Sequence, residues 1–139
     1  MTKEKAIEAG LALIERSAIA LLGAVNNDGY PLIKAMLKME TTGLNTVWFT
    51  TNKSSNRTAL FAKNPKACVY FLDDEKFEGL MLVGDIEIKD DAASRQRIWR
   101  DGYEIYYPQG VNDPDYATMK FTTKWVNYYR GLQKVTFQI

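Results

Sequence analysis

The sequence of 139 residues contains no histidine and a single cysteine, Cys68. Without histidine, a Ser-His-Asp triad, a Cys-His pair and a haem held by a proximal histidine are all excluded. One cysteine cannot form an intrachain disulfide, and on its own it cannot complete the usual zinc ligand sets. Because Cys68 lies in the apolar run "ACVYF", we expect a small buried side chain, and a reducing compartment. No metal site is expected.

The sequence also lacks an excess of charge of one sign and any long apolar run. It has 18 Lys and Arg against 17 Asp and Glu, for a net charge of +1. Nucleic-acid binders and polybasic membrane patches usually show a basic excess. No apolar run approaches the roughly 18 residues that span a bilayer, and "MTKEKAIEAG" lacks the apolar core of a signal peptide. We expect a soluble cytoplasmic protein that binds neither nucleic acid nor membrane.

The length and the ordinary globular composition favour one domain over residues 1–139. Short turns between successive strands favour an antiparallel sheet, and a small β-barrel with helices on its outside is the simplest arrangement. The fold class expected is therefore α+β, mainly β. The predicted helices cover 3–17, 55–63 and a segment from Asp90 or Asp91 to about 103, and the predicted strands cover 17–25, 30–40, 46–51, 66–73, 78–90, 116–122, 125–130 and 132–138.

Local patterns make four sharper predictions within these elements. Thr2 is expected to cap the first helix, and the Asp-Gly pair at 28–29 predicts a hairpin turn. Gly79 and Gly84 lie inside a long strand, where glycine indicates a bulge or a bend of the barrel. The helical periodicity predicts one apolar face on the first helix, made of Ile7, Leu11, Ile14 and Ala18.

The segment "FTTNKSSNRTAL", residues 49–60, joins a predicted strand to a predicted helix. The first turn of a helix has free backbone N–H groups and a positive dipole end, which together favour phosphate. Lys34 would add a charge if its strand paired alongside 46–51. Serine and asparagine are also ordinary helix caps, so the segment alone leaves a plain turn open. The hydroxyls and cations that it supplies are Thr50, Thr51, Lys53, Ser54, Ser55 and Arg57.

Four stretches, in this order, resemble the flavin-binding split-barrel proteins related to pyridoxamine 5′-phosphate oxidase, and in particular the short general stress protein 26 type. No single stretch is specific, but together they cover most of the chain. They are "DGYPLIKAM" (28–36), "VWFTTNKSSNRTALFAKNPKACVYF" (47–71), "LVGDIEIKDD" (82–91) and "YYPQGVNDPDYATMKFTTKWVNYY" (106–129).

The resemblance implies a single flavin-binding split-barrel domain with FMN bound at the interface of a homodimer. It implies that the phosphate is faced by Lys34, Lys53, Ser55 and Arg57. It further implies that the isoalloxazine ring is lined by Thr50 and Thr51, with backbone groups near Lys34 and Met36.

Eight of the 17 aromatic residues lie between 103 and 129. Most are expected to pack in the core or at a dimer interface, because Tyr and Trp are favoured there. Tyr107 and Trp125 are the two that we select to stack against the ring. A barrel this small has little room for FMN inside it, which also favours a groove between two copies.

The sequence departs from the family pattern at three places. Asn127 to Arg130 stand where the family often has Glu-Tyr-Trp-Asp, and Lys34 stands where arginine is common, so the bidentate fork is lost. The final residues "QKVTFQI" lack the Arg and His that serve the vitamin substrate in true pyridoxamine phosphate oxidases. We therefore do not expect that activity.

The leading hypothesis is an FMN-dependent oxidoreductase of unknown substrate, with no catalytic residue assigned. A flavin carrier, buffer or stress-linked sensor without turnover would use the same binding residues. A deazaflavin or a B6 phosphate could replace FMN on the same phosphate site, and an empty barrel could act only as a dimeric interaction module.

Overall fold

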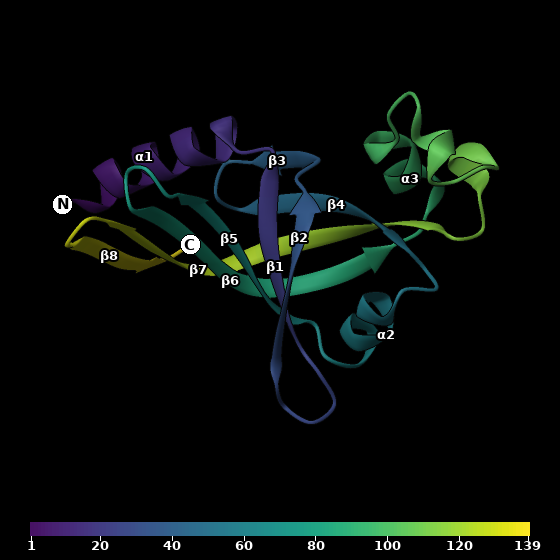
Figure 1. Ribbon diagram of the computed structural model, residues 1–139, viewed down its shortest axis with the longest axis horizontal. Helices are drawn as coiled ribbons and strands as arrows, with labels where there is room; N and C mark the ends of the chain where they lie inside the picture. The colour runs from purple at the N-terminus through teal and green to yellow at the C-terminus, as the bar shows by residue number, and fades with distance from the viewer.

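The computed structural model describes all residues from 1 to 139 and contains three α-helices, eight β-strands and two short 3₁₀ helices (Figure 1). Their bounds are α1 Lys3–Arg16, β1 Ile19–Val25, β2 Pro31–Leu37, β3 Glu40–Thr42, β4 Thr46–Asn52, α2 Asn56–Lys63, β5 Lys66–Asp73, β6 Glu78–Lys89, α3 Ala92–Ile98, η1 Tyr103–Ile105, η2 Gly110–Asn112, β7 Tyr116–Arg130 and β8 Gln133–Gln138.

The strands form one curled antiparallel sheet in the order β2-β1-β5-β6-β7-β4-β3, and β8 also pairs with β7. Along one edge of β7, residues 116–122 pair with β4, whereas residues 125–130 pair with β8. The sheet therefore divides at β7, which confirms the expected α+β split barrel. Figure 1 shows α1 and β8 at one end of the molecule, and α3 with the 3₁₀ turns at the other.

The hairpin and the bulge predicted from glycine are both present. Gly29 has φ of +84° in the turn between β1 and β2. The register of β6 against β7 shifts between Val83 and Gly84. A Cβ atom at Gly84 would lie 1.9 Å from the carbonyl oxygen of Thr122, so no side chain fits at this point. The two strands expected at 116–122 and 125–130 form a single strand, β7, which stays paired with β6 on both sides of the bulge.

The buried face of α1 differs from the predicted one. Thr2 caps the helix as expected, because its Oγ1 accepts a hydrogen bond of 3.2 Å from the backbone N–H of Lys5. The buried residues, however, are Ala6, Gly10, Leu13 and Ile14, while Leu11 is exposed and Ala18 lies outside the helix. A Cβ atom at Gly10 would be 3.2 Å from Leu80, so the helix approaches the sheet along its smallest residue. A periodicity of large apolar residues could not reveal that contact.

Two other boundaries differ from the sequence-based prediction. The strand expected at 30–40 ends at Leu37, and a short strand β3 follows. The third helix is capped by Asp91, whose Oδ2 accepts from the N–H of Ser94 at 3.0 Å, and it ends at Ile98 and not near 103. The segment after it contains two 3₁₀ turns. None of the helices is long and apolar enough to cross a membrane.

A hydrophobic core of 20 buried residues lies inside the curled sheet and under α1. At its edge, the buried carboxylate of Glu78 accepts hydrogen bonds from Tyr128 and Arg16. These contacts join the start of β6 to β7 and to the end of α1. Away from this cluster, α2 packs against β1, and the candidate functional site lies between α2, β1 and β2.

Candidate functional site

The loop between β4 and α2, residues 53–55, is held in place by Asp115 from the segment before β7. The Asp115 carboxylate accepts from the backbone N–H of Ser54 at 2.8 Å and from the side-chain amide of Asn52 at 2.8 Å. The backbone carbonyl oxygen of Asp115 accepts from the backbone N–H of Lys53, also at 2.8 Å. The hydrogen bond from Asn52, followed by that from Ser54, holds the pKa of this carboxyl below its usual value. These hydrogen bonds tie the loop to the segment before β7.

Three hydroxyl groups cluster at the start of α2. Ser55 caps the helix, with its Oγ accepting from the N–H of Thr58 at 3.2 Å. The Ser55 Oγ also lies 3.3 Å from Thr51 Oγ1 and 2.9 Å from Thr58 Oγ1. Because the first N–H groups of a helix carry a partial positive charge, this cluster adds donors at an end that already favours an anion.

Arg57, in the first turn of α2, has a buried Nε that finds no hydrogen-bond partner. Burial lowers the pKa of its guanidinium, and Arg57 belongs to none of the six ion pairs of the chain. Arg95 has the chain's other unpartnered buried Nε, but its Nη1 donates to the carbonyls of Val111 and Asp113. A buried donor without an acceptor costs about 1–3 kcal/mol. Arg57 thus lacks the acceptor that a ligand anion would supply.

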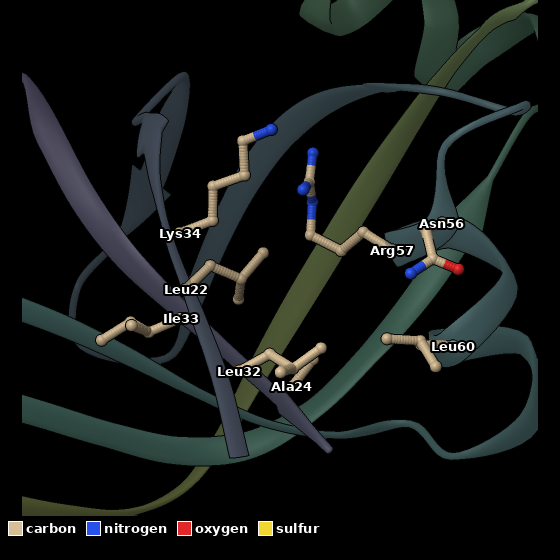
Figure 2. A pocket seen from close by; sticks show the side chains of 8 residues that line it. All are labelled: Leu22, Ala24, Leu32, Ile33, Lys34, Asn56, Arg57 and Leu60. Atoms are coloured by element: carbon tan, nitrogen blue, oxygen red, sulfur yellow. The ribbon is translucent and has the colours of Figure 1, made fainter. Parts of the chain in front are cut away.

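A cavity of about 320 Å³ lies between β1, β2 and α2, and we call it the aliphatic cavity. In Figure 2, Lys34 on β2 and Arg57 on α2 point toward each other. Most of the aliphatic side chains lie away from their nitrogen atoms. Lys34, like Arg57, forms none of the ion pairs. The cavity is lined by Leu22, Ala24, Leu32, Ile33, Lys34, Asn56, Arg57 and Leu60.

The arrangement that brings Lys34 and Arg57 to one cavity differs from the one considered from the sequence. The residues alone bring Lys34 to the phosphate site only on the condition that its strand pairs alongside residues 46–51. In the structure β2 pairs with β1, with Lys34 opposite Leu22, and has no ladder to β4. Lys34 and Arg57 line the same cavity because β2 pairs with β1 and α2 packs against β1.

A second cavity of about 270 Å³ lies on the other side of Arg57, and we call it the tyrosine cavity. Its lining contains no Asp, Glu or Cys side chain. It brings together five of the residues selected from the sequence: Met36, Thr50, Thr51, Arg57 and Tyr107. The other lining residues are Ala35, Leu37, Asn52, Tyr103 and Tyr106.

Tyr107 is the least exposed aromatic side chain of the tyrosine cavity. It is 4% exposed and packs against the ring of Tyr116 with centroids 4.8 Å apart. Burial raises the pKa of its phenol, and the nearby Thr50 side chain opposes part of that rise. Tyr103 and Tyr106, which we did not select, line the same cavity. Their spacing to Tyr107 (i, i+3, i+4) places all three on one side of a helical turn and could have identified them.

Three selected residues line neither cavity. Lys53 forms an ion pair with Asp90 at 2.7 Å, and the Ser55 hydroxyl lies 3.3 Å from the Thr51 hydroxyl, outside both linings. Trp125 is 36% exposed on β7, opposite Val83 and Gln138. A role for Trp125 at a ring stays a prediction.

Comparisons with known proteins agree with the fold. The sequence profile of the family described as pyridoxamine 5′-phosphate oxidase like matches residues 5–139. A crystal structure from Clostridium acetobutylicum is 48% identical, with a TM-score of 0.89 over 99% of this chain and 97% of that chain. It is described as a protein related to general stress protein 26 of B. subtilis, of the pyridoxinephosphate oxidase family. No curated protein sequence matches the chain significantly.

Two more distant structures share the fold alone. General stress protein 26 from Bacillus anthracis is 16% identical, with a TM-score of 0.79 over 96% of this chain and 98% of that chain. A haem binding protein from Mycobacterium smegmatis is 14% identical, with a TM-score of 0.77 over 99% of this chain and 60% of that chain.

Proposed function

The chain belongs to the pyridoxamine 5′-phosphate oxidase-like family, and we propose that it is a cofactor-binding protein whose cofactor is FMN. The observation that carries the proposal is the buried, unpartnered Nε of Arg57, which lies between the two cavities. A group that supplies an anion at Arg57 and a planar body beside it would satisfy the guanidinium and fill the adjoining space.

The residues present fit the two ends of FMN. A phosphate monoester carries nearly two negative charges at neutral pH, and Lys34 and Arg57 offer two cations without ion-pair partners. The tyrosine cavity offers Met36 and the two threonines of β4 for the ring, with Tyr107 beside them. Lys53 could join the phosphate if it left Asp90, since ion pairs between exposed side chains contribute little.

Bound FMN would supply the redox chemistry, and the chain would supply binding and electrostatics. Lys34 and Arg57 would hold the phosphate, and Asp115 would keep the loop in position. Tyr107, whose raised pKa keeps its phenol protonated at neutral pH, would hold a hydroxyl proton beside Thr50. We propose a flavin-dependent oxidoreductase of undetermined substrate as the activity.

One observation favours a second candidate function, a flavin-binding protein without turnover. The lining of the tyrosine cavity has no carboxylate or thiol, so the tyrosines are its only titratable groups apart from Arg57. Proton transfer to a substrate would then depend on phenols or on water. Multiple turnovers of NADH or NADPH by the flavin-loaded protein would eliminate this candidate.

We further propose that a second copy of the chain covers β2. Every residue of this edge strand except Met36 is exposed, and Ile33 has 70% of its surface exposed. Lysine in place of Ile33 should therefore produce a monomer in sedimentation, whereas Leu132→Lys, at a fully exposed residue in the turn between β7 and β8, should not. A wild-type protein that is monomeric at micromolar concentration would refute the dimer.

The cofactor proposal is tested by the visible spectrum of the purified protein and by titration with FMN, followed through flavin fluorescence. Arg57→Ala should weaken binding by about 1.5–3 kcal/mol, the contribution of a charge-assisted hydrogen bond. Arg130→Ala is the matched control, because Arg130 is exposed and has no ion pair. A deazaflavin, pyridoxal phosphate and haemin should bind less tightly than FMN. An equal loss of FMN affinity in Arg57→Ala and Arg130→Ala, or no binding of FMN by the wild type, would overturn the proposal.

A further inference from the structure

The aliphatic cavity has a composition that FMN does not explain. Five of its eight lining residues are Leu, Ile or Ala, and none is aromatic. The polar groups are Lys34, Arg57 and Asn56. A phosphate held by the two cations with its ring in the tyrosine cavity would leave the aliphatic part of this space unused. Its volume, about 320 Å³, is within the range of small-molecule sites.

The two cations of the cavity lie apart from most of its aliphatic side chains, whereas Asn56 lies beside Leu60 (Figure 2). In Figure 2 the nitrogen atoms of Lys34 and Arg57 lie on one side, and Leu22, Leu32 and Ala24 lie on the other. A ligand that matches this arrangement has one anionic group and one aliphatic body. The guanidinium of arginine pairs with a carboxylate through two parallel hydrogen bonds, which would also satisfy the buried Nε of Arg57.

We propose that the aliphatic cavity binds an ionised aliphatic carboxylate, that is, a medium-chain fatty acid. Its carboxylate pairs with Lys34 and Arg57, and its chain lies among Leu22, Ala24, Leu32, Ile33 and Leu60. Fatty-acid binding does not depend on the FMN proposal, although the carboxylate would use the same two cations as the FMN phosphate; only the competition between the two ligands rests on that proposal.

Charge makes the two ligands mutually exclusive. Lys34 and Arg57 together carry two positive charges, whereas a phosphate monoester and a carboxylate together carry nearly three negative ones. Like charges brought together at one site repel each other, and the desolvated surroundings of Arg57 strengthen that repulsion. Binding of the fatty acid therefore releases the flavin, and the chain carries an inhibitory or sensing site for aliphatic anions.

The test is calorimetric titration of the ligand-free protein with hexanoate, octanoate, decanoate and dodecanoate below their micelle concentrations, with 1-decanol as the uncharged comparison. Affinity should rise roughly fourfold per methylene, from the transfer free energy of one buried CH₂, until the cavity is full. Decanoate should raise the apparent Kd of FMN in proportion to its own concentration. Decanol should bind at least tenfold more weakly than decanoate, since it cannot pair with the cations.

Two variants separate the contributions of tail and headgroup. Leu32→Trp adds bulk to the lining of the cavity and should abolish decanoate binding while FMN still binds. Because Leu32 lies on β2, where we propose a second copy, sedimentation should show that the variant keeps the association state of the wild type. Ile19→Trp is its matched control, since Ile19 is a similarly exposed strand residue outside the cavity. Lys34→Met should weaken decanoate tenfold or more and leave decanol unchanged.

The outcomes distinguish this site from the flavin proposal. Decanoate binding without FMN binding would refute the flavin proposal and leave the fatty-acid site standing. FMN binding with no saturable decanoate binding would refute the fatty-acid site alone. Equal affinities for decanoate and decanol, or unchanged decanoate binding in Leu32→Trp, would also overturn it.

Discussion

Replacing Arg57 with methionine should change stability and ligand affinity in opposite directions. Methionine keeps a long flexible side chain at the position but removes the buried Nε that has no partner. An unsatisfied buried donor costs about 1–3 kcal/mol, and part of that cost is recovered when the donor is replaced by an apolar group. We expect the ligand-free variant to be more stable than the wild type by about 1 kcal/mol, which corresponds to a rise in Tm of roughly 3–5 °C for a chain of this size.

The same substitution removes a charge-assisted contact with the phosphate. A loss of about 1.5–3 kcal/mol corresponds to a roughly 10- to 150-fold weaker Kd for FMN. At a free FMN concentration of 100 times the wild-type Kd, binding stabilises the wild type by about 2.7 kcal/mol. The order of the two melting temperatures should therefore reverse when FMN is added.

The assay is thermal unfolding of the wild type, Arg57→Met and Arg130→Met, each with and without FMN, together with fluorescence titrations of flavin. Arg130→Met should follow the wild type in every condition, because Arg130 lines neither cavity. A ligand-free Arg57→Met protein that melts below the wild type and binds FMN normally would refute the reasoning. That result would mean that Arg57 supports the fold through its stem and has no part in binding.

Three further predictions concern other parts of the structure. Asp115→Asn should weaken FMN binding by freeing the loop of residues 53–55. Because the pKa of the Asp115 carboxyl is lowered in the folded protein, the stability that it contributes is present above about pH 4 and lost below. The Tm of the variant should therefore depend less on acid pH than the Tm of the wild type. Gly84→Ala should lower the free energy of unfolding by more than about 3 kcal/mol in urea denaturation, because its Cβ would meet a backbone oxygen at 1.9 Å, whereas Gly23→Ala, with its nearest neighbour at 3.5 Å, should cost little. Burial, together with the hydrogen bond to Glu78, raises the pKa of Tyr128 to about 12. The stability that this phenol contributes is therefore complete below about pH 10 and lost as the pH rises to 12. Tyr128→Phe should flatten that part of the plot of stability against pH, and an unchanged plot would contradict the assignment.

Local chemistry in the sequence predicted the features that depend on a few neighbouring residues. The Asp-Gly turn before β2, the cap at Thr2 and the bulge at Gly84 each follow from one backbone requirement, and the structure confirms all three. The ordered motifs also identified the split barrel. The face of α1 could not be predicted from large apolar residues, because the helix approaches the sheet at Gly10.

The sequence predicted several of the residues that line the two cavities, but not how those residues are arranged. The segment 49–60, singled out from the sequence, contains Arg57 and the two threonines of the tyrosine cavity. The approach of Lys34 to Arg57 depends on how α2 crosses β1, which no local pattern encodes. The support from Asp115 joins residues more than 60 positions apart, since Ser54 donates to it across a separation of 61.

The division of the sheet at β7 also bears on how the chain folds as it is made. β4 has only the three-residue strand β3 beside it until Tyr116–Arg130 has been synthesised. At about 5–20 residues per second, the ribosome needs roughly 4–16 s to go from the end of β4 to the end of β7. During that interval the buried side of β4 stays exposed, with an unpaired edge available to other chains. Substitutions that slow the docking of β7 should therefore reduce the yield of soluble protein before they reduce the stability of the molecules that do fold.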